Sequence, residues 1–154
     1  MDEFEFLDEF DRIPGEEIDL VLAFKAPGIA SMDIVPTYLY DIVLHGTYNV
    51  VGKIDVRIGM NAKLYYGGQV GYSVEENYRG SGFAAKACRL VRRVAAAHGM
   101  KSLLITCDPD NAASRRTCEN LGAELLEIVD LPPDHDMYLE GARRKCIFEW
   151  KLDE

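Results

Sequence analysis

A turn rich in glycine offers the clearest chemistry in this sequence. It reads Tyr78-Arg79-Gly80-Ser81-Gly82-Phe83-Ala84 and leads directly into a segment with helical periodicity. Glycines at alternate positions let the backbone turn tightly and let a ligand approach its N–H groups closely. Several such N–H groups at the positive end of a helix bind phosphate oxygens without a charged side chain. The turn therefore predicts a phosphate-binding site, and a simple tight connection between strand and helix is the alternative that the residues leave open.

Basic side chains follow this turn, in a chain that is acidic as a whole. Residues 79–93 contain five basic residues and no acidic one, whereas the formal net charge of all 154 residues is -9. Arg79, Lys86 and Arg89 could meet the outer charges of a polyphosphate, or they could form the solvated face of a helix. The negative net charge opposes the phosphate neutralisation on which generic nucleic-acid binding depends. We therefore expect no nucleic-acid partner.

Four segments before the turn have the composition of β-strands. Each is rich in β-branched or aromatic residues, and each is followed within three residues by glycine, proline or asparagine, which favour turns. They cover residues 17–24, 38–44, 50–58 and 65–74. Successive strands separated by turn residues suit antiparallel pairing, so we expect an antiparallel meander.

The hydrophobic period changes to that of a helix after Gly82 and keeps it as far as His98-Gly99. Residues 102–107 form a compact apolar run typical of a buried strand, residues 112–120 predict a second helix, and residues 146–152 predict a final strand. A strand, a helix and a strand in succession imply parallel pairing of the two strands. The expected fold is α/β (α+β), a mixed sheet forming one domain over residues 1–154.

Two enzyme classes use a glycine-rich turn of this kind. One is the dinucleotide-binding class, whose fingerprint G-x-G-x-x-A fits Gly80, Gly82 and Ala85, with Asp108 at the end of the next strand. That fold usually begins with this unit, whereas here more than 70 residues precede the turn and 46 follow Asp108. The sequence leaves no room for the second half of such a domain.

The wider pattern resembles a different class. Val74 stands four residues before Tyr78, and the turn, a helix and a strand are followed by Asn111-x-x-Ser114 and by Glu119-Asn120-Leu121-Gly122-Ala123. This arrangement resembles the GNAT superfamily of acetyl-coenzyme A-dependent N-acetyltransferases, in the style of its RimJ/RimL-like branch. The resemblance covers about residues 65 to 125.

The resemblance implies how acetyl-CoA would be held. In the family, main-chain amides of the turn hold the pyrophosphate, and pantetheine lies between the strand that ends at Val74 and its parallel neighbour near Cys107. Asn111 and Ser114 resemble polar contacts to pantetheine and the phosphates, although Asn111 suits a helix N-cap equally well. The residues expected to bind the cosubstrate are Val74, Arg79, Gly80, Ser81, Gly82, Phe83, Ala84, Asn111 and Ser114.

The catalytic side chains are less clearly marked. Many family members place a tyrosine that protonates the leaving thiolate where this chain has Cys118, so Cys118 is either that acid or a packing residue. The attacking amine must lose a proton, and Asp108 at a strand end is a candidate base. Tyr72 could orient a water molecule or the substrate. The segment 65–74 contains no acid, so the glutamate base of some members is absent.

The resemblance implies transfer of an acetyl group from acetyl-CoA to a primary amine by direct attack, with a small-molecule or peptide acceptor. The missing tyrosine and glutamate motivate an alternative of another class, a non-catalytic CoA-binding regulatory or sensory module. Whether the chain forms a homodimer stays open.

Other classes of protein find no support in the composition. The four cysteines are far apart with no C-x-x-C pair, so we expect reduced thiols in the core and no metal. No run approaches the roughly 18 apolar residues of a membrane span, so we expect no membrane partner. The acidic N-terminal residues lack the features of a secretory signal, which favours a cytoplasmic location.

Overall fold

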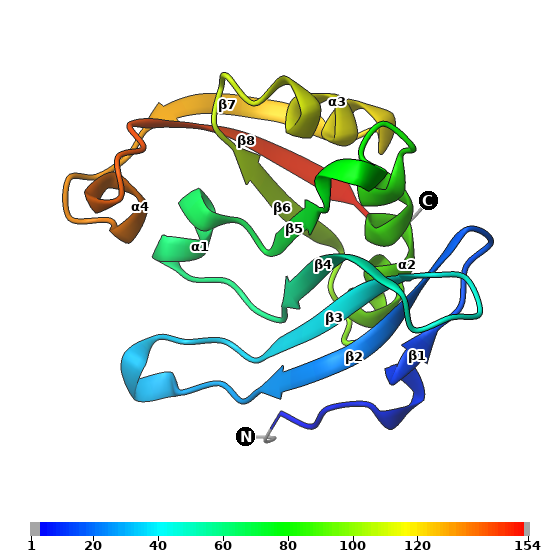
Figure 1. The fold of residues 1–154 in the computed structure, drawn as a ribbon. Coiled ribbons are helices and arrows are strands. Elements are labelled where there is room, and N and C mark those ends of the chain that lie inside the picture. The colour runs from blue at the N-terminus through cyan, green and yellow to red at the C-terminus, as the bar shows by residue number, and fades with distance from the viewer. Residues whose placement is uncertain (1–3, 153–154) are drawn as a thin grey trace.

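The computed structural model describes residues 4–152, which fold into two antiparallel sheets with helices around them (Figure 1). The strands are β1 (Arg12–Ile13), β2 (Ile18–Ala26), β3 (Thr37–Leu44), β4 (Val50–Arg57), β5 (Val70–Val74), β6 (Ser102–Cys107), β7 (Glu124–Asp130) and β8 (Arg144–Lys151). The α-helices are α1 (Ala62–Gly67), α2 (Phe83–Ala97), α3 (Ala112–Asn120) and α4 (Asp136–Leu139), and the 3-10 turns are η1 (Asp8–Phe10), η2 (Ala30–Met32) and η3 (Glu76–Tyr78).

The first sheet has the order β1-β2-β3-β4-β5 with antiparallel pairing throughout, which confirms the predicted meander. Residues paired across neighbouring strands share a face of the sheet. Tyr40 pairs with Ile54, and Ile54 pairs with Tyr72, so these three side chains lie on one face. Tyr40 and Ile54 are buried there in the hydrophobic core.

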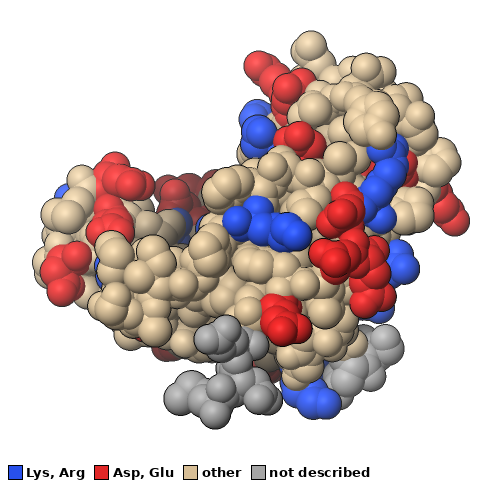
Figure 2. Space-filling view, turned by 90° about the horizontal axis from the view of Figure 1, so that it is seen from below, with Lys and Arg blue, Asp and Glu red and all other residues tan. Residues whose placement is uncertain are grey.

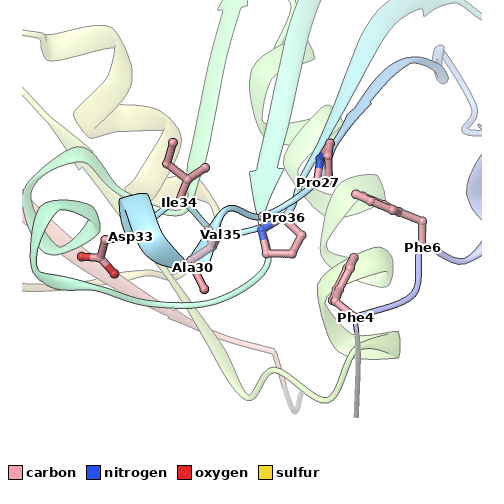
Figure 3. A pocket seen from close by; sticks show the side chains of 9 residues that line it. Phe4, Phe6, Pro27, Ala30, Asp33, Ile34, Val35 and Pro36 are labelled. Atoms are coloured by element: carbon pink, nitrogen blue, oxygen red, sulfur yellow. The ribbon is translucent and has the colours of Figure 1, made fainter. Parts of the chain in front are cut away.

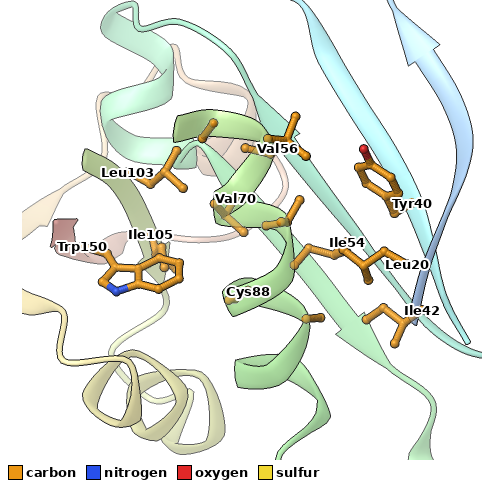
Figure 4. Close-up of a cluster of buried hydrophobic side chains, with 14 of the residues drawn as sticks. Leu20, Tyr40, Ile42, Ile54, Val56, Val70, Cys88, Leu103, Ile105 and Trp150 are labelled. Carbon is orange, nitrogen blue, oxygen red and sulfur yellow. The ribbon is translucent and has the colours of Figure 1, made fainter. Parts of the chain in front are cut away.

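Helix α2 covers this face. Its apolar positions fall three and four residues apart, and Ala87, Cys88, Val91 and Val94 are fully buried against the sheet (Figure 4). The predicted helix over residues 82–98 is therefore confirmed. All four cysteines are free and buried, as expected for reduced core thiols. Acidic and basic side chains are interspersed among uncharged ones over the surface seen from below (Figure 2).

The second sheet has the order β6-β8-β7. Strands β6 and β8 correspond to the predicted segments 102–107 and 146–152, and α3 has the predicted bounds. Strand β7 and helix α4 were not predicted. In residues 4–152 no helix combines the length and the hydropathy that a transmembrane segment needs.

The strand predicted over residues 65–74 is wrong in its first part. Residues 62–67 form helix α1, because the Asn61 side chain caps it by accepting a hydrogen bond from the Leu64 N–H at 2.9 Å. Gly68 ends the helix with φ +81°, a conformation that glycine adopts readily. Strand β5 begins only at Val70.

The expected parallel pairing of β5 and β6 is also wrong. Within the described residues the two strands form no ladder, and they belong to different sheets. They meet at Gln69, whose N–H donates to the Leu104 carbonyl at 2.7 Å and whose side-chain oxygen accepts from the Leu104 N–H at 2.8 Å. Beyond this point the strands diverge (Figure 1). The Gln69 side chain thus accepts from the Leu104 N–H, which a continuing ladder between β5 and β6 would need as a donor.

Candidate active site

The glycine-rich turn forms the connection from β5 to α2. Gly80 and Gly82 have φ of +88° and +75°, and a Cβ atom placed on either would meet no atom within 4 Å. Among the hydrogen bonds within residues 4–152, none is donated by the backbone N–H groups of residues 80–84. Helix α2 has no side-chain cap at Gly82. The turn therefore presents unpaired donors to open space, as an anion site requires.

Basic side chains brace this turn. Arg79 donates from Nε to the Val74 carbonyl at 2.9 Å, and Lys86 donates to the Ser81 carbonyl at 3.1 Å. Lys86 also pairs with Glu17, the residue before β2, at 2.8 Å. These contacts join the turn to the end of β5 and to the first sheet. They leave the charges of Arg79 and Lys86 beside the unpaired N–H groups.

A hydrogen-bonded pair connects β5 with α3. The hydroxyl groups of Tyr72 and Ser114 lie 2.7 Å apart, and burial raises the pKa of the Tyr72 phenol. The Asn111 side chain accepts from the Ser114 N–H at 3.0 Å, so Asn111 is the N-cap of α3. The fold thus brings Tyr72 to Ser114, which is 42 positions away in the sequence and lies in the first turn of the helix that Asn111 caps. Tyr72 remains protonated at neutral pH and can donate a proton.

The other two catalytic candidates lie in different surroundings. Cys118 is completely buried, and this burial raises the pKa of its thiol to about 12. Because Cys118 is completely buried, its thiol suits packing in the core, whereas the Tyr72 side chain is only partly buried. The Asp108 carboxylate accepts from Lys145 of β8 at 2.7 Å, and that lysine side chain is 7% exposed. Removing the carboxylate would leave a buried ammonium group without this partner, which indicates a structural role.

Sequence analysis missed two neighbouring side chains on β4. Asp55 pairs with Arg57 at 3.0 Å, and Arg57 also donates to the Gly68 carbonyl at the end of α1 at 2.7 Å. The Asp55 carboxylate lies against Gly71 of β5. A Cβ atom built on Gly71 would be only 2.6 Å from Oδ1 of Asp55, so a larger residue would not fit at this position. Burial raises the pKa of Asp55, which brings it closer to that of a base useful near neutrality. The alternation of charged and apolar residues along 53–57 could have indicated that these charged side chains share one face of the strand.

A separate cavity of about 480 Å³ lies between the N-terminal residues and the β2–β3 connection (Figure 3). Its lining is mostly apolar, with Phe4, Phe6, Ile34 and Pro36 around it and Asp33 as its charged side chain. Figure 1 places this connection at the end of the molecule opposite the glycine-rich turn. The cavity is therefore separate from the Tyr72–Ser114 pair and the turn. In the described residues, no group of three or more metal-binding side chains is present.

A turn with free N–H groups at a helix N-terminus, beside two diverging strands, is an arrangement that suits a phosphate-bearing ligand. A sequence model described as "Acetyltransferase (GNAT) domain" matches residues 19–124. The chain belongs to the GNAT acetyltransferase family, which confirms the resemblance seen in the sequence. A search of curated proteins finds no match.

Solved structures of this family have the same fold. A ribosomal-protein-S5-alanine acetyltransferase from Vibrio fischeri superposes with a TM-score of 0.67 at 12% identity, over 93% of this chain and 97% of that one. RimL, a ribosomal L7/L12 alpha-N-protein acetyltransferase, gives 0.65 at 14%, over 92% and 94%. The microcin C7 self-immunity acetyltransferase MccE, in complex with acetyl-CoA and AMP, gives 0.59 at 18% over 75% of this chain, which spans 61% of that protein.

Proposed function

We propose that this protein transfers an acetyl group from acetyl-CoA to a primary amine by direct attack, without an acyl-enzyme. The observation that carries the proposal is the set of unpaired N–H groups over residues 80–84 at the start of α2. The open space beside Gly80 and Gly82 fits an approaching diphosphate. A family relative bound to acetyl-CoA supports the same cosubstrate.

The remaining contacts to the cosubstrate follow from the fold. The turn from Arg79 to Ala84 holds the diphosphate, and pantetheine lies where β5 and β6 diverge, against the main chain near Val74. Ser114 reaches this space from α3, while Asn111 contributes by capping the helix that carries Ser114. The metal-free chemistry expected from the sequence remains part of the proposal.

Acetyl-CoA supplies an activated thioester when bound. Main-chain N–H groups of β5 between Tyr72 and Val74 stabilise the negative charge that develops on the thioester oxygen. The Tyr72 hydroxyl supplies the proton that the departing thiolate takes up, and Ser114 keeps that hydroxyl in place. Tyr72 thereby takes the role that the sequence offered to Cys118, whose thiol is buried.

The function is tested by titrating the protein with acetyl-CoA in a calorimeter and then assaying thiol release with small primary amines and with peptides that have free N-termini. We expect saturable acetyl-CoA binding and release of free thiol that depends on the amine. Binding of NAD in place of acetyl-CoA would support the dinucleotide-binding class instead. Acetyl-CoA binding with thiol release at background for every amine would support the non-catalytic CoA-binding module.

The Tyr72 hydroxyl gives a direct test of the proton donor. We expect Tyr72→Phe to lower kcat about 100-fold, the smaller end of the usual effect of a general acid, while leaving acetyl-CoA affinity nearly unchanged. Tyr40→Phe is the matched control, because it removes a buried hydroxyl on another strand that donates to the Phe10 carbonyl at 2.7 Å. Equal losses of kcat in the two variants would show a general effect of lost hydrogen bonds and would exclude Tyr72 as the donor.

One observation favours the non-catalytic alternative. Two side chains that the sequence offered for catalysis, Asp108 and Cys118, are engaged in an ion pair and in the core. A protein that binds CoA for regulation needs neither. The amine-dependent release of thiol decides between the two functions.

A further inference from the structure

Strand β7 is an exposed sheet edge. It pairs with β8 on one side, and the described part of the chain places no strand on its other side. The side chains of residues 124–128 are all exposed. Leu125, Leu126 and Ile128 are 39%, 45% and 36% exposed, although apolar side chains of this size are usually buried.

Natural edge strands usually carry features that prevent pairing with another chain, such as charged side chains, above all lysine, as well as proline, very short length or bulges. Strand β7 spans seven residues, and its sequence contains neither lysine nor proline. A register shift between Leu125 and Glu127 is its irregularity, and pairing with β8 continues regularly from Glu127 to Asp130. Its three acidic side chains oppose pairing with an acidic strand but not with a basic one, so the free N–H and C=O groups of its regular part, from Glu127 to Asp130, are suited to accept an added basic strand.

The charge of this edge favours a basic partner. Residues 124–142 contain six acidic residues and no lysine or arginine. Of the acids on β7, Glu127 accepts a hydrogen bond from Tyr65, and Asp130 is 3.6 Å from Arg144 with its side chain 91% exposed. Glu124 appears in no ion pair among the described residues. The three basic residues that follow, Arg143, Arg144 and the buried Lys145, leave residues 124–145 with six acids against three bases, so the edge is negative overall and attracts cations.

A second copy of the chain suits this edge poorly. Antiparallel pairing of all seven residues of β7 with themselves places Glu124 opposite Asp130 and Glu127 opposite Glu127. Like charges directly opposite each other destabilise a pair of strands. An extended segment that alternates arginine or lysine with apolar residues avoids this repulsion and covers the exposed leucines.

We propose that β7 binds an extended basic polypeptide as an added antiparallel strand, and that this polypeptide carries the amine to be acetylated. Its second part rests on the proposed function. Neighbouring strands are about 4.8 Å apart, so a strand added to β7 lies about 15 Å from β6, which borders the divergence of β5 and β6. About five extended residues span that distance. The N-terminus of a docked polypeptide thus reaches the acetyl-transfer site.

Docking is measured apart from catalysis with an eight-residue peptide of alternating arginine and valine, acetylated at its N-terminus and amidated at its C-terminus. This peptide contains no amine that can be acetylated. We expect it to bind in a calorimeter and to slow amide hydrogen exchange in residues 124–130. The same peptide with N-methyl groups on alternate residues keeps its charge but cannot form the ladder, and we expect its affinity to fall at least tenfold.

The charge contribution is tested with the double variant Glu124→Gln and Asp130→Asn, which we expect to bind the peptide about tenfold more weakly. The matched control is Glu9→Gln with Glu16→Gln, which removes the same charge near the N-terminus, far from β7 (Figure 1). Equal binding of the N-methylated peptide, equal losses in the two double variants, or protection of β7 that rises with protein concentration alone would overturn the docking proposal.

The acceptor role has its own measurement. The same arginine–valine peptide with a free N-terminus should be acetylated with a KM that rises about tenfold in the Glu124→Gln and Asp130→Asn variant, while a small primary amine keeps its KM. Peptide docking without peptide acetylation, in a protein that acetylates the small amine, would refute the acceptor role alone. Thiol release from no amine, with docking intact, would refute the proposed function and leave the docking surface in place.

Discussion

Replacing Gly82 with aspartate is expected to weaken acetyl-CoA binding more than about 100-fold, which corresponds to about 2.7 kcal/mol. The new carboxylate would lie among the N–H groups proposed to hold the diphosphate, and it would repel that anion while competing for its donors. A Cβ atom at this position meets no other atom within 4 Å, so the side chain can be accommodated. The effect on folding should be small beside the effect on binding.

The matched control is Gly82→Asn, which has the same shape and no charge. Both residues must adopt the φ of +75° found at Gly82, a conformation that asparagine and aspartate tolerate better than other side chains. Calorimetric titration with acetyl-CoA and thermal unfolding of both variants separate charge from backbone strain. Affinity in Gly82→Asp equal to that in Gly82→Asn would contradict the assignment of this turn as the diphosphate site.

The turn and the elements around it could be predicted because their signals are local. The spacing of Gly80 and Gly82, the periodicity of residues 84–95 and the compact run 102–107 each lie within one element. Such patterns report conformation directly, since the side chains that decide it are neighbours in sequence. The strands of the antiparallel meander follow from the same kind of signal, because their composition and the turn residues after them are local.

One error came from local signals that were missed, and the other from a contact between distant residues. Tyr65 and Tyr66 suit a strand by composition, yet the cap at Asn61 and the left-handed Gly68 make their segment helical. The parallel ladder fails because the Gln69 side chain takes up the N–H of Leu104, 35 residues away. A strand, a helix and a strand in succession predict parallel pairing, and the sequence pattern does not indicate that a side chain interrupts it.

The candidate site shows the same division. The main-chain donors were predictable from glycine spacing, whereas the partners of the catalytic candidates were not. Tyr72 meets Ser114 across 42 positions, and Asp108 meets Lys145 across 37. These contacts place the Tyr72 hydroxyl against Ser114 of α3 and the Asp108 carboxylate against a buried lysine. The exposure of β7 also depends on which strand lies beside it, which no local pattern reveals.

Asp19 should be the carboxylate on which folding depends most. It is 1% exposed, and its oxygens accept hydrogen bonds from the N–H groups of Gly46 and Gly15, each at 2.9 Å. Arg12 and the ring of His45 contact the same carboxylate at 2.7 and 2.8 Å. The side chain therefore joins the N-terminal segment and the β3–β4 turn to β2. Burial acts to raise the pKa of Asp19, but the donors, above all the Gly46 N–H, hold it well below the ordinary range.

This lowered pKa fixes the sign of the pH dependence. The ionised form is favoured in the folded state, so its stabilising effect is complete above the unfolded pKa of about 3.9 and is lost as the pH falls toward the folded value. Asp19→Asn should remove this contribution. We expect the free energy of unfolding of the wild type to fall more steeply between pH 5 and pH 2 than that of the variant, because only the wild type loses the charge of Asp19 there.

At pH 7 we expect Asp19→Asn to lose about 3 kcal/mol of stability, the lower end of the about 3–5 kcal/mol for breaking a buried ion pair, because Arg12 is 32% exposed. The control is Asp41→Asn on β3, whose pair with Lys53 at 3.1 Å is more exposed. An ion pair of that kind contributes about 0–1 kcal/mol. Urea unfolding at pH 7 and at pH 3 measures both variants. Similar losses of unfolding free energy in the two variants at pH 7 would show that Asp19 behaves as a surface carboxylate. Its four hydrogen bonds would then stabilise the fold no more than hydrogen bonds to water do.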